Sequence, residues 1–128
     1  MLRDAALKFT RELPGTLTIR SVNADGILIS DQVWTETVAL TPDEIVAAWR
    51  PAPLAELTET DFAPLFAHAP ELVIVGAGAK SEFPPRELMF AFARLGIGLE
   101  VMDTAAAART FNVLAGEGRR VAAVLYPA

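Results

Sequence analysis

The sequence contains no cysteine and a single histidine, His68, among its 128 residues. The missing cysteine excludes disulfides, thiolate nucleophiles and sulfur ligands for metals. One histidine leaves little basis for a classical zinc site or a histidine-based triad. His68 lies at the C-terminal end of an expected helix, and the helix dipole favours a positive charge at that end. The residues therefore point to no metal, no cofactor and no catalytic group.

Positive charge and long apolar runs are also scarce. The chain has 11 Lys and Arg against 16 Asp and Glu, a net charge of -5, which argues against nucleic acid as a partner. Residues 1–64 hold 5 basic and 10 acidic residues, whereas residues 65–128 hold 6 of each. No window reaches the roughly 18 apolar residues of a membrane helix, and the N-terminus does not resemble a signal peptide. We expect no membrane insertion and a cytoplasmic location.

The composition and the first third of the chain indicate one folded domain over residues 1–128. Apolar residues make up 52% and charged residues 21%, which excludes intrinsic disorder. Residues 1–14 end at a Pro-Gly turn signal and are expected to form an extended arm. Alternating polarity and an Asp-Gly turn then predict an antiparallel meander. Its three expected strands cover residues 17–22, 27–30 and 33–39.

The rest of the chain alternates between helix and strand patterns. Thr41-Pro42 predicts a short helix that the following prolines end. Three further helices are predicted over residues 58–67, 85–95 and 104–116. Three strands are predicted over residues 72–75, 97–102 and 120–126. Strands that alternate with helices favour right-handed crossovers and a parallel sheet. The expected fold is a three-layer α/β core with an N-terminal β-meander.

Ligands of open α/β sheets bind outside the carboxyl ends of the strands, and several polar or small residues are expected there. The glycines can supply backbone N–H groups, and the two basic side chains can hold an anion. The candidate ligand-binding residues are Gly76, Gly78, Lys80, Asp103, Thr104, Arg109 and Asn112.

Structural roles explain the same residues. The glycines lack the spacing of a dinucleotide or Walker loop, and they suit a tight exit from the strand. Asp103 suits a helix N-cap, and Arg109 and Asn112 on one helix face can anchor neighbouring backbone. Leu95 is expected on the buried face of its helix, whereas Phe90 lies off that face, which predicts that Phe90 is exposed to a partner.

The stretch from Leu72 to Pro127 resembles the Mth938 domain family. The resemblance rests on the segments Glu-Val-Met-Asp-Thr at 100–104 and Arg-Thr-Phe-Asn-Val-Leu at 109–114. This family contains uncharacterised bacterial and archaeal proteins and the mitochondrial complex I assembly factor 3 group. The resemblance implies a single domain with a central mixed, mostly parallel sheet. Many relatives carry cysteine where this chain has Ala108 and tyrosine where it has Phe111, so no thiol-based activity is implied.

Two functions remain open after this comparison. The resemblance implies a non-catalytic accessory or assembly factor that binds a protein partner, as the mitochondrial relatives help to build respiratory complex I. The alternative is a small anionic-ligand-binding protein or enzyme that uses the rim residues. We favour the first, because Glu100 and Asp103 are the candidate acid–base groups and Asp103 is explained as a helix cap.

Overall fold

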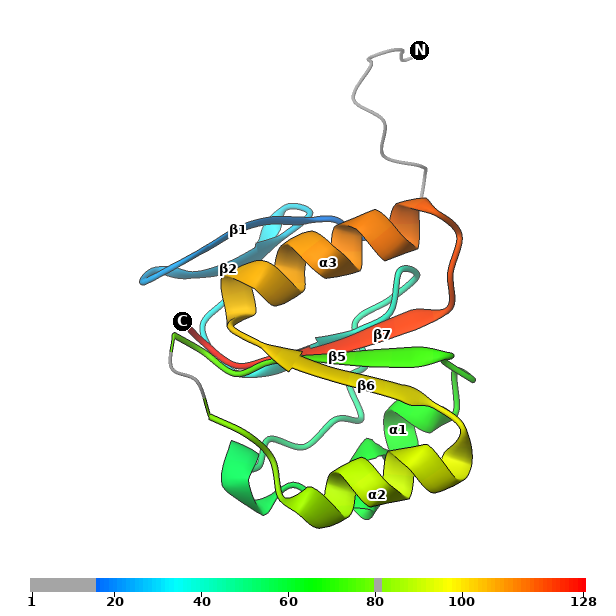
Figure 1. Cartoon of the computed structure of the whole chain (residues 1–128). Coiled ribbons are helices and arrows are strands. Elements are labelled where there is room, and N and C mark those ends of the chain that lie inside the picture. The colour runs from blue at the N-terminus through cyan, green and yellow to red at the C-terminus, as the bar shows by residue number, and fades with distance from the viewer. Residues whose placement is uncertain (1–15, 80–81) are drawn as a thin grey trace.

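The central layer of the protein is a four-stranded sheet with the strand order β4-β7-β5-β6 (Figure 1). The computed structural model describes residues 16–79 and 82–128. The strands of this sheet are β4 (Val38–Leu40), β5 (Leu72–Gly76), β6 (Gly98–Met102) and β7 (Val121–Leu125). β5 runs parallel to β6 and β7, whereas β4 pairs antiparallel with β7. The expected mixed, mostly parallel sheet is confirmed.

Helices and a second sheet cover the two faces of this central layer (Figure 1). One face carries α3 (Thr104–Gly116) and a three-stranded antiparallel meander. The meander strands are β1 (Ile19–Asn23), β2 (Gly26–Ile29) and β3 (Gln32–Trp34). The opposite face carries α2 (Arg86–Leu95), α1 (Ala63–Phe66) and two short 3-10 turns, η1 (Leu54–Glu56) and η2 (Glu59–Phe62). The three-layer core and the added meander therefore match the expectation.

β5 is apolar throughout because it is buried on both faces. Val73 and Val75 belong to the core beneath the sheet, where the rings of Phe62 and Phe92 meet edge to face at 5.1 Å. Ile74 belongs to the other core, between the sheet and α3. Neighbouring residues of a strand point to opposite faces, so a continuous apolar run is what a doubly covered strand requires.

The single strand expected over residues 33–39 is wrong, because this segment forms two strands in two sheets. Trp34 of β3 pairs with Ile27 in the meander, whereas Val38 of β4 pairs with Leu125 in the central sheet. Three consecutive polar residues, Thr35, Glu36 and Thr37, separate the two strands, but a polar run also fits an exposed strand, so the pattern does not reveal the change of partner. The segment between β3 and β4 therefore connects the meander to the central sheet.

No helix follows Thr41, although its side chain makes the hydrogen bonds of a cap. The Thr41 hydroxyl accepts from the backbone N–H groups of Asp43 (3.2 Å) and Glu44 (3.3 Å). The chain then turns back, because Leu40 forms a β-bridge with Ile45. The short helix predicted from Thr41 is therefore wrong, and the threonine stabilises a turn instead.

The outer side of α2 confirms one expectation and corrects another. Phe90 is exposed, as predicted, with 58% of its surface accessible. Leu95 was expected on the buried face but is 47% exposed. It occupies the last helical position before Gly96, whose positive φ of 72° ends the helix.

The predicted arm over residues 1–14 lies outside the described residues. Within the described part of the chain, no helix has the length and apolar character needed to cross a membrane.

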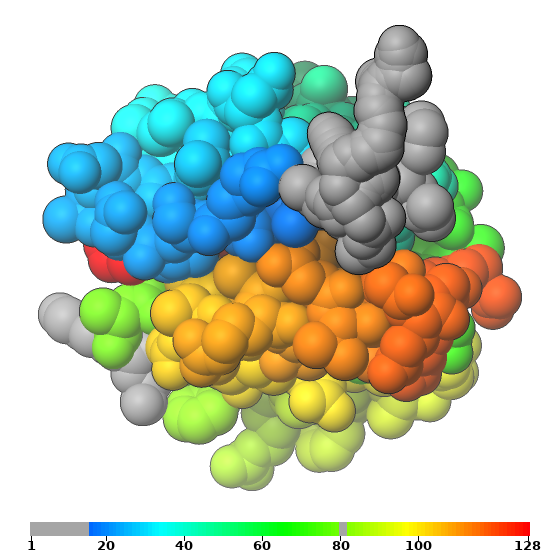
Figure 2. All heavy atoms as spheres, turned by 90° about the horizontal axis from the view of Figure 1, so that it is seen from above, coloured from blue at the N-terminus to red at the C-terminus, as the bar shows by residue number. Residues whose placement is uncertain are grey.

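Asn112 attaches the meander to α3. Its Oδ1 accepts a hydrogen bond from the backbone N–H of Ile19 (3.0 Å), and its Nδ2 donates one to the Ile19 carbonyl (2.8 Å). The amide thus occupies the edge of β1 as a neighbouring strand would. Figure 2 shows the start of the meander, in blue, lying alongside α3, in orange.

We expect Asn112→Ala to lower the free energy of unfolding by about 1–3 kcal/mol, because it leaves two backbone groups of Ile19 without partners. Arg109→Ala on the same helix is the control, since Arg109 is exposed and should change stability by less than about 0.5 kcal/mol. Urea denaturation measures both variants. Equal stability of the two variants would contradict the anchoring role.

Candidate functional site

The predicted rim centres on Thr104, whose side chain is fully buried between three loops. Its hydroxyl accepts a hydrogen bond from the Gly78 N–H (2.8 Å) and donates one to the Tyr126 carbonyl (2.6 Å). The Thr104 N–H in turn donates to the Gly78 carbonyl (3.0 Å). The loops after β5 and β7 and the start of α3 are therefore tied together at the carboxyl ends of the parallel strands.

The two glycines of the rim permit this close approach. A Cβ on Gly76 would lie 2.9 Å from both Cα and Oγ1 of Thr104, and 3.1 Å from Cβ of Ala107. Gly78 has a positive φ of 85°, and a Cβ there would lie 3.0 Å from the Pro127 carbonyl oxygen. Close packing accounts for both glycines, and the rim is filled by protein at these positions.

Two of the three charged residues predicted at the rim, Asp103 and Arg109, belong to the described part of the chain. Asp103 accepts a hydrogen bond from the Ala106 N–H (2.8 Å) as the N-cap of α3, and its side chain is exposed. Arg109 is exposed and forms no hydrogen bond or ion pair with the described residues. Lys80 lies outside the described residues. No described contact brings Arg109 to the rim, since it follows Thr104 by five residues, about 7.5 Å further along α3.

Asn112 does not belong to the rim. It follows Thr104 by eight residues, which is about 12 Å along a helix, and its amide is bonded to Ile19. The structure thus brings together Gly76, Gly78, Asp103 and Thr104 and separates Asn112 from them. Whether these residues bind a ligand stays a prediction.

A cleft of about 840 Å³ lies at the opposite end of the sheet, where β5 and β7 begin. It is lined by the segment that leads into β1, the turn after β4, the segment after α1, and the end of α3 with the loop that leads into β7. Its polar side chains include Asp43, His68, Asn112, Arg119 and Arg120. Sequence reasoning missed this cleft because four separate segments form it, and no local motif marks any of them.

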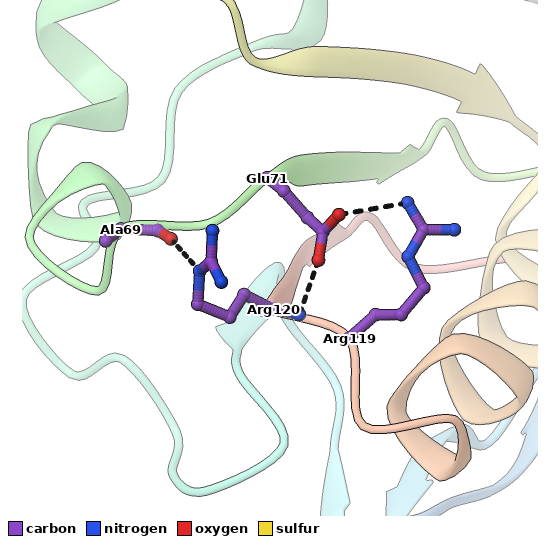
Figure 3. Close-up of polar contacts among 4 residues, drawn as sticks. All are labelled: Ala69, Glu71, Arg119 and Arg120. Carbon is purple, nitrogen blue, oxygen red and sulfur yellow. Dashed lines mark hydrogen bonds and ion pairs between the residues drawn. The ribbon is translucent and has the colours of Figure 1, made fainter.

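Glu71 links the two strands beside this cleft (Figure 3). Its carboxylate accepts hydrogen bonds from the Arg120 backbone N–H (3.1 Å) and from the Arg119 guanidinium (3.2 Å). The Arg120 N–H foremost, and the Arg119 side chain after it, hold the pKa of Glu71 below its ordinary value. The Arg120 Nε donates to the Ala69 carbonyl (2.9 Å). Glu71 therefore connects the starts of β5 and β7 through charged hydrogen bonds, and it does not serve as a proton donor at neutral pH.

A protein-family model described as "Protein of unknown function (DUF498/DUF598)" matches residues 19–126. This match covers both sheets and all the helices described above, apart from the chain ends. The chain therefore belongs to the DUF498/DUF598 family.

Known proteins of similar sequence and structure agree with this assignment. The chain is 34% identical over 119 residues to the human NADH dehydrogenase [ubiquinone] 1 alpha subcomplex assembly factor 3, a match that covers 91% of this chain and 64% of the relative. An NMR structure of a Xanthomonas campestris protein is 38% identical, with a TM-score of 0.78 over 87% of this chain and 84% of that one. An NMR structure from Bordetella pertussis, described as a Mth938-like domain, is 27% identical, with a TM-score of 0.70 over 94% of this chain and 92% of that one. The fold is Mth938-like, as the resemblance implied.

The close contact at Gly76 predicts that Gly76→Ala lowers the free energy of unfolding by about 1–3 kcal/mol, because the new methyl group overlaps Thr104. Gly116→Ala is the matched control. Nothing lies within 4 Å of a Cβ on Gly116, which is in α3, so this change should be neutral or stabilise by up to about 1 kcal/mol. Chemical denaturation measures the difference. A Gly76→Ala variant as stable as Gly116→Ala would show that the rim has room for a side chain.

The hydrogen bond and burial of Tyr126, the only tyrosine in the chain, lead us to expect that the stability of the fold depends on pH above 10. Its hydroxyl donates to the Ala52 carbonyl (2.7 Å), and burial, with a smaller effect of Asp61, raises its pKa from 10.0 to about 12. Ultraviolet titration of the folded protein should therefore show a midpoint near 12, with Tyr126→Phe as the baseline. Between pH 10 and 12 the unfolded chain loses this proton while the folded chain keeps it, so stability should fall as pH rises. A midpoint at 10 in the folded protein would contradict the burial of this phenol.

Proposed function

We propose that this chain is a non-catalytic accessory protein that supports assembly of a respiratory NADH dehydrogenase by binding one of its protein components. The observation that carries this proposal is the match to the human assembly factor, which extends over nearly all of the described residues. That relative is longer than the matched segment, so the role is proposed for the shared domain. A cytoplasmic location is part of the same proposal.

The chemistry of the rim supports a role without catalysis. The Thr104 hydroxyl is occupied by two backbone partners, and the Asp103 carboxylate caps α3. Glu100, the other acid–base candidate, is exposed on the edge strand β6. A general acid or base needs a free proton-accepting atom beside a substrate, and the exposed carboxylate of Asp103 at the described rim is engaged as a helix cap.

Anion binding at the rim remains the alternative. It is supported by the exposed Arg109 and the nearby start of α3, where the helix dipole favours negative charge. Close packing at Gly76 and Gly78 counts against it, because both glycines already have structural roles. We therefore place this alternative second.

Deletion of the gene in its native host tests the proposal. We expect the amount of assembled NADH dehydrogenase on a native gel to fall, and an affinity-tagged copy of the chain to capture a subunit of that complex. Wild-type protein and Arg109→Ala should restore assembly equally, since the assembly role does not use the rim cation. An unchanged amount of the complex after deletion would refute the proposal. Rescue by wild type but not by Arg109→Ala, with a phosphate-induced rise in melting temperature that this variant lacks, would favour the anion site.

A further inference from the structure

The cleft where β5 and β7 begin has the size of a small-molecule site. Its volume of about 840 Å³ falls within the range of roughly 300–1,000 Å³ that such sites occupy. Part of its wall is apolar and comes from Leu17, Pro42, Pro70, Ala115 and Val121. The Leu17 N–H donates to the Pro42 carbonyl (2.8 Å), which joins the segment before β1 to the turn after β4. The space can therefore hold a molecule of the size of a metabolite.

Two arginines line this cleft directly after the end of α3. Basic residues at such a position often neutralise the last carbonyl groups of the helix. Here the Arg119 guanidinium bonds to Glu71 (3.2 Å) and the Arg120 Nε bonds to the Ala69 carbonyl (2.9 Å), as Figure 3 shows. Neither side chain donates to a carbonyl of α3, so the end of the helix does not account for these cations.

Arg120 is the cation that a ligand can use. Arg119 shares its charge with Glu71, whereas the Arg120 guanidinium forms no ion pair with the described residues. Its bond to Ala69 fixes the guanidinium through Nε, and the remaining N–H groups have no acceptor in the described part of the chain. A guanidinium held in this way can bind a carboxylate or phosphate through two parallel hydrogen bonds.

Thr41 brings a second donor to the cleft from a different segment. Only 5% of this residue is exposed. Its oxygen accepts hydrogen bonds from the N–H groups of Asp43 and Glu44, but its own O–H donates to no acceptor among the described residues. Buried donors are nearly always paired in folded proteins. An acceptor oxygen in the cleft would therefore complete the hydrogen bonding of this hydroxyl.

The other polar groups of the cleft also favour an anion. His68 adds a ring N–H, whereas the amide of Asn112 is occupied by Ile19. Asp43 is exposed, and no other Asp or Glu of the described chain lines the cleft. Basic side chains thus outnumber acidic ones there, although the chain as a whole carries a net charge of -5.

We propose that this cleft binds a small molecule that carries a carboxylate or phosphate group. Arg120 holds the anionic group, Thr41 donates a hydrogen bond to the ligand, and the apolar wall covers the rest of the molecule. This inference goes beyond the proposed function, because contact with a protein partner requires no small ligand. The site is also separate from the rim, which lies at the opposite end of the sheet.

Titration of the full chain with inorganic phosphate and, separately, with succinate tests the site. We expect the amide NMR signals of Asp43, Glu44 and Arg120 to shift in a saturable way, with a dissociation constant of about 1 mM or lower. Saturation by phosphate alone assigns a phosphate-bearing ligand, and saturation by succinate alone assigns a carboxylate. Saturation by both shows that the site accepts either group.

Matched variants connect the binding to the two donors. Arg120→Gln should raise the dissociation constant about tenfold, because it removes the charged donor. Arg94→Gln is the control, since it removes the same charge from an exposed position on α2 and should leave the constant unchanged. Thr41→Val should raise the constant about fivefold, whereas Thr41→Ser keeps the hydroxyl and should bind as the wild type does. Circular dichroism verifies that each variant is folded.

Several results would overturn the proposal. Shifts that do not saturate with either anion refute a site, and equal weakening by Arg120→Gln and Arg94→Gln shows attraction by charge alone. Saturable shifts confined to the start of α3, and lost in Arg109→Gln, would place the anion at the rim instead. The titrations involve no protein partner, so failure of the cleft leaves the deletion experiment on respiratory assembly unaffected. The two failures can therefore be distinguished.

Discussion

The buried hydroxyl group of Thr104 is the contact on which the arrangement of the layers depends. It needs both hydrogen-bond partners, because a buried polar group without one costs about 1–3 kcal/mol. Gly78 and Tyr126 supply those partners from the loops after two different strands. Gly76 lets α3 come close enough to make them. The position of α3 then determines where Asn112 meets β1, so the placement of the meander depends on a contact at the other end of the helix.

The same contact limits what the rim can do. A hydroxyl and a glycine N–H that hold the backbone together are not available to a ligand unless these bonds are replaced at equal strength. In many α/β proteins the carboxyl ends of the strands are left open for a ligand. In this protein the loops there close on one another, and Thr104, Asp103 and the two glycines stabilise the fold. Among the described residues, the exposed features without such a role include the apolar side chains of α2.

The sequence predicts the second half of the fold well, because each element there has a strong local signal. β5 is an uninterrupted apolar run, α3 begins at an acidic cap, and α2 ends at a glycine with positive φ. The failures come from long-range pairing. Residues 33–39 change sheets through a short polar run that a single exposed strand would also fit, and the turn at Thr41 is decided by pairing between Leu40 and Ile45. Asn112 bonds to a residue 93 positions earlier, which no local spacing reveals.

Charge and apolar exposure are distributed differently along this chain, and this difference bears on how it meets other proteins. Ten of the 16 acidic residues precede residue 65, while the exposed apolar cluster around Phe90 belongs to the half with no net charge. Repulsion between like-charged molecules weakens where the local charge is balanced, and it is screened beyond about 8 Å at physiological ionic strength. The acidic half is not remote from α2 in space, however, because Glu59 of η2 lies 3.8 Å from Arg94 of α2. Contact at α2 therefore takes place beside acidic side chains of the first half, and its electrostatic cost depends on the charges that the opposite surface carries.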